Sequence, residues 1–89
     1  MNAIITVIGH DKVGIIAKVS NVLSRHNINI LDINQTIMKT FFTMVMLVDI
    51  SDSNTDFGVL ANELESVGTE IGLQVKIQHE DIFNSMHRI

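Results

Sequence analysis

The alternation of apolar and polar residues predicts four strands and two helices in this chain. The strand segments are rich in β-branched residues, and either alternate with a period of two or are apolar on both faces. The helical segments carry apolar residues at intervals of three and four. A short amphipathic segment with helical spacing ends the chain. The strands are expected at residues 3–9, 28–37, 41–50 and 73–79, the helices at 13–25 and 56–71, and the amphipathic segment at 82–89.

This βαββαβ order predicts an α+β, ferredoxin-like sandwich. Both β-α-β crossovers are expected to be right-handed, which places the two helices on one face of the sheet. The segments 3–9 and 41–50 are apolar on both faces and therefore belong in the middle. The expected antiparallel strand order is 4-1-3-2. We expect one domain over residues 1–89, with a C-terminal helical tail at about 81–89 that covers an apolar stripe on the open face, unless a second copy or a partner covers it.

Composition narrows the classes of protein. The chain has 89 residues, 46% of them hydrophobic and 18% charged, as in one small globular domain. It has no cysteine, which excludes disulfides and thiolate metal sites. A net charge of −4 argues against binding nucleic acid. The apolar run at residues 4–8 is too short for a signal peptide or a membrane span, so we expect a cytoplasmic protein.

The turn between the first strand and the first helix is the strongest indication of a binding site. It contains Gly9, His10, Asp11 and Lys12, and Gly14 precedes the helix. The first N–H groups of a helix lack partners within it and favour an anion such as a carboxylate. Two plainer interpretations stay open at this point: Gly14 as a residue that only starts the helix, and Asp11 as an ordinary N-cap.

The sequence resembles the ACT domain along nearly its whole length. The resemblance rests on Gly9-His10-Asp11-Lys12-Val13-Gly14-Ile15-Ile16, on Ile28-Asn29-Ile30 with Gln35-Thr36, and on Phe41-Phe42-Thr43-Met44. It is nearest to short stand-alone prokaryotic ACT proteins and to the ACT halves of the glycine cleavage system regulator. The resemblance implies a βαββαβ module that binds an amino acid and regulates a metabolic enzyme or transcription.

The same resemblance implies a set of ligand-binding residues. Asp11 stands where ACT domains carry the Asn or Asp that grips the ligand, three residues before the loop glycine, Gly14. Val13 replaces a proline common in the family. Gly9 occupies the place of a histidine found in some serine-binding relatives, with His10 shifted by one. The full implied set is Gly9, His10, Asp11, Lys12, Val13, Gly14, Ile15, Asn29 and Ile30.

Asp11 and Asn29 of one chain are expected to lie far apart in this topology. An antiparallel pair of chains along the second strand and first helix would bring Asp11 of one copy toward Asn29 of the other. Pairing would also protect an apolar edge strand. The sequence therefore predicts a homodimer with two equivalent sites.

Other chemistries have weaker support. The histidines at positions 10, 26, 79 and 87 lack the spacing of a metal site, and most of them are interpreted as surface residues. His10 alone lies in the candidate loop, and Glu63 is interpreted as part of a solvated helix face. Phe41 and Phe42 lack the basic neighbours of an RNA-binding platform. Acyl-phosphate hydrolysis needs a loop arginine, and the first loop offers only Lys12. No convincing acid–base pair occurs.

The leading hypothesis is thus a non-catalytic, homodimeric regulatory module for an amino acid or similar zwitterion, without metal or cofactor, acting on a partner protein that the sequence does not name. The alternative is a protein-interaction adaptor that uses the fold for assembly without a ligand. An enzyme on the same fold is a third, weaker hypothesis.

Overall fold

The computed structural model describes residues 1–10 and 12–86, and the side chains of Phe83 and Met86 are not among the described groups. The elements follow the predicted βαββαβ order, with one further helix at the C-terminal end. The four strands form an antiparallel sheet in the order β2-β3-β1-β4, which is the predicted order read from the other edge. The elements are β1 (Asn2–His10), α1 (Ile15–Arg25), β2 (Asn29–Met38), β3 (Phe41–Asp49), α2 (Phe57–Ile71), β4 (Leu73–His79) and α3 (Glu80–Met86).

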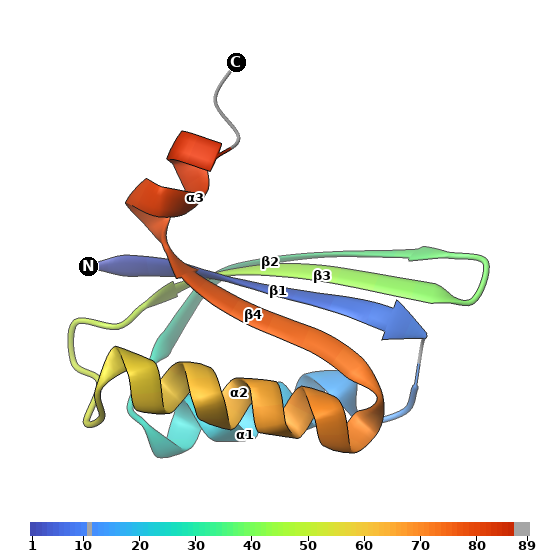
Figure 1. Cartoon of the computed structure of the whole chain (residues 1–89), viewed down its shortest axis with the longest axis horizontal. Coiled ribbons are helices and arrows are strands. Elements are labelled where there is room, and N and C mark those ends of the chain that lie inside the picture. The colour runs from blue at the N-terminus through green and yellow to red at the C-terminus, as the bar shows by residue number, and fades with distance from the viewer. Residues whose placement is uncertain (11, 87–89) are drawn as a thin grey trace.

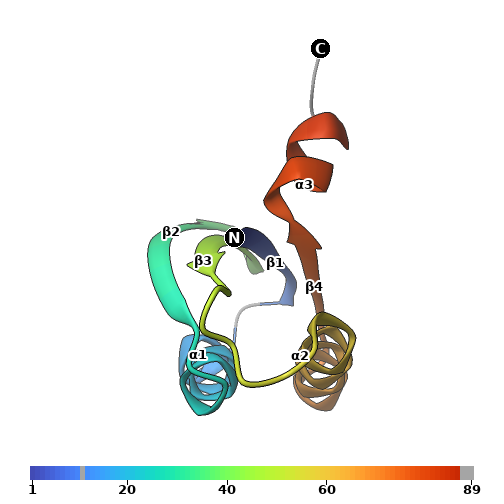
Figure 2. The same ribbon diagram turned by 90° about the vertical axis from the view of Figure 1, so that its left-hand side faces the viewer.

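Both long helices lie on one face of the sheet, as predicted (Figure 1). Viewed along the strands, α1 lies below the β2–β3 half and α2 below β4 (Figure 2). Every second residue of β1, β3 and β4 points into the space between sheet and helices and is buried. The sheet contributes Ala3, Ile5, Val7, Phe42, Met44, Met46, Val48, Leu73, Val75 and Ile77 to this core. The helices contribute Ile15, Val19, Val22, Leu23, Leu60 and Leu64.

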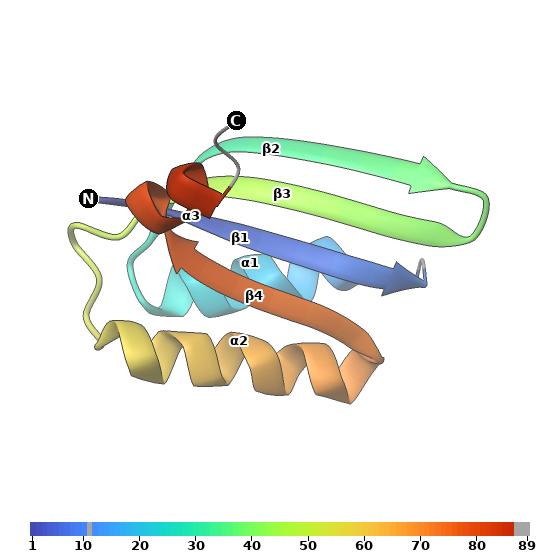
Figure 3. The ribbon, with the colours of Figure 1, turned by 45° about the horizontal axis from the view of Figure 1, so that its top comes forward.

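Strand β2 departs from the regular pattern in two ways. A register shift between Ile30 and Asp32 places Leu31 in a β-bulge, which explains why apolar and polar residues alternate imperfectly there. A two-residue turn at Lys39–Thr40 leads to β3, and Lys39 has a positive φ of 57°. The hairpin extends past the ends of both long helices (Figure 3). All ten residues of β2 are consequently exposed.

The C-terminal helix was predicted to cover the open face of the sheet, and it covers one end of that face. Helix α3 contacts β1 and β4 near the beginning of β1 (Figure 3). At the other end of the open face, Ile8 remains 45% exposed and Phe41 54% exposed. Ile82 of α3 is itself 52% exposed. The last part of the predicted tail, residues 87–89, lies outside the described residues.

Close packing of α2 on β4 depends on Gly68. A Cβ atom built at this position would lie 2.7 Å from Cγ2 of Val75 and 2.8 Å from the backbone oxygen of Leu73. Real Cβ atoms do not approach so closely, so the helix would have to move away from the strand. Gly58, in the first turn of the same helix, has no atom within 4 Å of the corresponding position.

The substitution Gly68→Ala should therefore destabilise the protein by about 1–3 kcal/mol, because an added methyl group overpacks the interface between α2 and β4. Gly58→Ala is the matched control, and should be neutral or stabilise by up to about 1 kcal/mol through its better helix propensity. Urea unfolding of the three proteins measures the difference. Equal stability of Gly68→Ala and the wild type would contradict the packing described here.

Candidate functional site

The described residues provide no side-chain cap at the beginning of helix α1. Its N-cap residue is Gly14, with φ 88° and ψ 6°, a left-handed conformation that suits glycine. The first bond within the helix runs from the N–H of Lys18 to the carbonyl of Gly14, at 3.0 Å. Among the described residues, no group accepts a hydrogen bond from the N–H groups of residues 15–17. These donors lie at the positive end of the helix dipole, where an anion is favoured.

A hollow of about 260 Å³ adjoins this helix end. We call it the N-terminal hollow. Helix α1 supplies one side, and β2 and β3 supply the other. Its apolar floor comes from Ile37 and Phe42, and Gln35 adds an amide group. The lining consists of Lys12, Gly14, Ile15, Ile16, Ala17, Gln35, Ile37 and Phe42.

A second hollow, of about 380 Å³, lies at the other end of α1, and we call it the C-terminal hollow. It is lined by Ser20, Leu23, Ser24, Asn27, Ile28, Asn29 and Ile30. The strand register explains the separation. His10 is opposite Phe41 at one end of the sheet, whereas Asn29 is opposite Asp49 at the other end. The hydroxyl and amide oxygens of this hollow are neutral hydrogen-bond acceptors.

The residues that the sequence assigned to one site are thus divided between these two places. Lys12, Gly14 and Ile15 line the N-terminal hollow, and Asn29 and Ile30 line the C-terminal hollow. One chain alone does not bring the two groups together.

Three other assigned residues, Gly9, His10 and Val13, line neither hollow. The His10 ring stacks on Phe41, with centroids 4.9 Å apart. Phe41 is on the open face, since its neighbour Phe42 points into the core. Val13 is fully exposed, and Gly9 lies so close to Leu73 that a Cβ atom there would overlap its side chain. Asp11 lies outside the described residues.

Lys12 also has a structural environment of its own. Its Nζ atom lies 3.1 Å from the place where a Cβ at Gly72 would be. Gly72 is the C-cap of α2, with φ 76°. An ammonium group beside the C-terminal end of a helix is favoured by the helix dipole. The ammonium group of Lys12 therefore lies beside the end of α2.

An exposed apolar surface runs between the two hollows, and we call it the edge patch. It consists of Ile16 on α1 and of Ile30, Ile33 and Ile37 on β2, which are 37–58% exposed. Their partners in β3 are the buried residues Val48, Met46 and Phe42, so these three β2 side chains point to the same side as the helices. A run of large apolar side chains on an unpaired edge strand is typical of an interaction surface.

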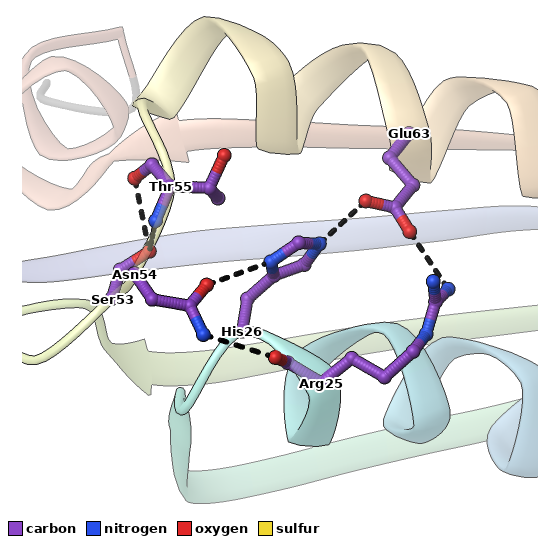
Figure 4. Close-up of polar contacts among 6 residues, drawn as sticks. All are labelled: Arg25, His26, Ser53, Asn54, Thr55 and Glu63. Atoms are coloured by element: carbon purple, nitrogen blue, oxygen red, sulfur yellow. Dashed lines mark hydrogen bonds and ion pairs between the residues drawn. The ribbon is translucent and has the colours of Figure 1, made fainter.

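A polar cluster that sequence reasoning missed joins α1 to α2 (Figure 4). His26, the C-cap of α1, contacts Oδ1 of Asn54 through Nδ1 at 2.9 Å and Oε2 of Glu63 through Nε2 at 2.5 Å. Arg25 pairs with Oε1 of the same carboxylate at 2.7 Å. The interpretation of Glu63 as part of a solvated face is wrong, because its side chain is 25% exposed, and the side chain of His26 is 17% exposed.

These contacts shift two pKa values in opposite directions. The hydrogen bond with Asn54, and then that with Glu63, raises the pKa of His26 above its ordinary value. The hydrogen bond with His26 is the largest cause that lowers the pKa of Glu63, and Arg25 adds to it. A third histidine, His79, stacks on Phe57 with ring centroids 4.0 Å apart, so it too is a packed residue.

Other features limit the chemistry. The described part of the chain contains no group of three or more His, Cys, Asp or Glu residues arranged to hold a metal ion. None of its helices combines the length and the apolar character that crossing a membrane requires. A further hollow of about 250 Å³ between α2 and β4 contains none of the residues assigned from the sequence; it is lined by Glu65, Thr69, Leu73, Gln74, Val75 and Lys76.

A model of the ACT domain family matches residues 2–78. The chain belongs to the ACT domain family. It is 57% identical over 86 residues to a UPF0237 protein from Methanocaldococcus jannaschii, covering 97% of this chain and 96% of that one. An ACT domain protein from Streptococcus pneumoniae is 44% identical with a TM-score of 0.81, and the match covers 98% of both chains.

The regulatory subunit of aspartate kinase from Thermus thermophilus also has this fold. It is 28% identical with a TM-score of 0.65, over 86% of this chain and 50% of that chain. The resemblance to the ACT domain seen in the sequence is confirmed. ACT domains are regulatory modules that typically bind amino acids and form dimers.

The left-handed conformation of Gly14 in this ACT domain leads to a testable prediction. Gly14→Ala should destabilise the protein by about 1–2 kcal/mol, because a residue with a Cβ atom resists the left-handed conformation. Gly14→Asn is the matched variant, since asparagine tolerates this conformation better. Thermal unfolding compares the two. An alanine variant as stable as the asparagine variant would show that the positive φ of Gly14 is not required.

Proposed function

We propose that the chain is a regulatory module that binds a free amino acid, or a similar zwitterion, at a site shared by two copies of itself. The observation that carries this proposal is the pair of hollows at opposite ends of the groove between α1 and β2. Among the described residues, the N-terminal hollow has the helix N–H donors but only one amide group, Gln35, whereas the C-terminal hollow has several hydroxyl and amide groups. Together they offer helix N–H donors for a carboxylate and neutral oxygen acceptors for an ammonium group.

Symmetry supports this combination. If two copies meet along β2 and α1 with their strands antiparallel, a two-fold axis places the beginning of one β2 beside the end of the other. The C-terminal hollow of one copy then adjoins the N-terminal hollow of its partner. The operation produces two identical sites. It also buries the edge patch of both chains, which would otherwise remain in contact with water.

Each part of the composite site has a distinct role. The uncapped N–H groups of residues 15–17 bind the carboxylate, and Ile37 and Phe42 contact the apolar part of the ligand. Asn29 and Ser24 of the other copy accept hydrogen bonds from the ammonium group. Ligand binding then ties two chains together. A partner protein that distinguishes the tied pair from the free pair would sense the ligand.

The dimer makes the first prediction of this proposal. The protein should sediment as a dimer at micromolar concentration, and Ile33→Glu should yield a folded monomer because it introduces a charge at the centre of the edge patch. Gln74→Glu places the same charge on the opposite edge strand and should leave the dimer intact. Sedimentation velocity distinguishes these results. A monomeric wild type would contradict the shared site.

Ligand binding makes the second prediction. In a thermal-shift screen of the twenty amino acids, a ligand at a hundred times its dissociation constant should stabilise the protein by about 2.7 kcal/mol. Ala17→Glu should abolish this response, because it places a negative charge in the first turn of α1, where that charge repels the carboxylate of the ligand. Asn29→Ala should also abolish the thermal shift, because it removes an acceptor for the ammonium group from the C-terminal hollow. A flat response of the wild type to all amino acids would favour the adaptor function.

Mixing the two inactive variants tests the sharing of the site. In a mixed dimer, one site carries both substitutions and the other carries neither. Random assortment of subunits should therefore restore about a quarter of the wild-type sites. Isothermal titration calorimetry of the re-equilibrated mixture counts them. A mixture as inactive as its components would place both residues in a site within one chain.

A further inference from the structure

The His26 cluster occupies the junction between α1 and the strand that forms the proposed dimer edge. His26 caps the end of α1, Asn27 follows with a positive φ of 59°, and β2 begins at Asn29. Asn27 and Asn29 both line the C-terminal hollow. Any change at His26 therefore acts on the segment that carries half of the proposed site.

The orientation of Asn54 requires a hydrogen-bond donor from His26. The amide nitrogen of Asn54 donates to the carbonyl of Arg25 at 3.1 Å, and its backbone N–H donates to the carbonyl of His26 at 3.2 Å. Turning the amide around would break the first of these bonds. The Oδ1 atom of Asn54 therefore faces Nδ1 of His26 as an acceptor, at 2.9 Å.

The second nitrogen of the ring also faces an acceptor. Glu63 has a lowered pKa and is ionised at neutral pH, so its Oε2 atom accepts from Nε2 of His26. A neutral imidazole has one N–H group, whereas an imidazolium has two. Both contacts are satisfied together only when the ring is protonated. Loss of the proton leaves one of the two acceptors facing a nitrogen lone pair.

The groups that face the ring come from each packed element. From α1, the guanidinium of Arg25 disfavours the positive charge on His26, and from α2 the carboxylate of Glu63 favours it. From the loop before α2, the neutral amide of Asn54 favours it as an acceptor. The next turn residue, Asn27, donates to the backbone oxygen of Asp52 in the same loop, at 3.2 Å.

We propose that His26 is a proton-dependent positioning residue, which when protonated holds the turn into β2 in the shape required for pairing with a second copy. This inference rests on the proposed function, because the turn supports β2, the strand along which the two copies are proposed to pair. Below about pH 6.5 the ring is protonated in both folded and unfolded chains, and the contribution of the cluster is complete. It is lost as the pH rises through the raised pKa of His26, and dimer affinity falls with it.

The test combines a local and a global measurement. Across about pH 6 to pH 9, NMR should show His26 titrating with a midpoint above 6.5, and the amide signals of Asn27 and Asn29 moving with the same midpoint. Sedimentation equilibrium should show the dimer dissociation constant rising by up to about 25-fold, because each of the two chains loses one hydrogen bond and each bond corresponds to about fivefold. Amide signals of Asn27 and Asn29 that do not change with the His26 titration would overturn the proposal.

Three variants distinguish a proton-dependent positioning role of His26 from a role in packing alone. His26→Gln carries no titrating proton and should make the dimer affinity independent of pH over this range. Glu63→Gln keeps an acceptor without the charge, and should move the midpoint to lower pH. His79→Gln removes a histidine elsewhere and should keep the wild-type profile. A dimer dissociation constant that still rises with pH in the His26→Gln variant would overturn the proposal.

Failure of the proposed dimer can be distinguished from failure of the positioning role of His26. If the wild-type chain is monomeric at every pH, the dimer proposal and the link to it both fail. The NMR titration then still decides whether His26 positions the turn, because it is measured within one chain.

Discussion

The arrangement of α1 and α2 on the sheet leaves the outermost strand exposed, and the functional features of this molecule depend on that constraint. The two helices bury the inner side of β1, β3 and β4. Strand β2 lies at the edge and extends with β3 beyond the helices, so its isoleucines remain in water (Figure 1). A domain of 89 residues buries little apolar surface by itself. Leaving four large apolar side chains exposed in so small a domain favours association along this edge.

The sequence predicted the architecture well because strands buried on one face and strands buried on both faces leave different patterns. Strand β4 has the predicted bounds, since Leu73, Val75 and Ile77 alternate strictly with polar residues. The central positions of β1 and β3 followed from their doubly apolar runs. Helix α1 begins two residues later than predicted, because Val13 continues the apolar pattern but Gly14 has a conformation that precedes the helix.

The candidate site was only partly predictable. The residues before α1 and at the start of β2 could be named because glycine placement and local resemblance are sequence properties. The polar cluster could not, because Arg25, Asn54 and Glu63 meet His26 only through tertiary packing. The one local signal was an Arg-His pair at the end of a helix, where cations are favoured. The exposed position of His10 beside Phe41 likewise depends on strand register, which residue type does not reveal.

The β-bulge at Leu31 has a consequence for how copies of this strand can align. A regular edge strand repeats every two residues, and a neighbour can slide along it and pair in several ways. The extra residue interrupts that repeat and bends the strand locally. A sliding neighbour would oppose the bulge with the wrong spacing. The irregularity thus favours one closed alignment over the open-ended stacking that leads an unguarded edge toward fibrils.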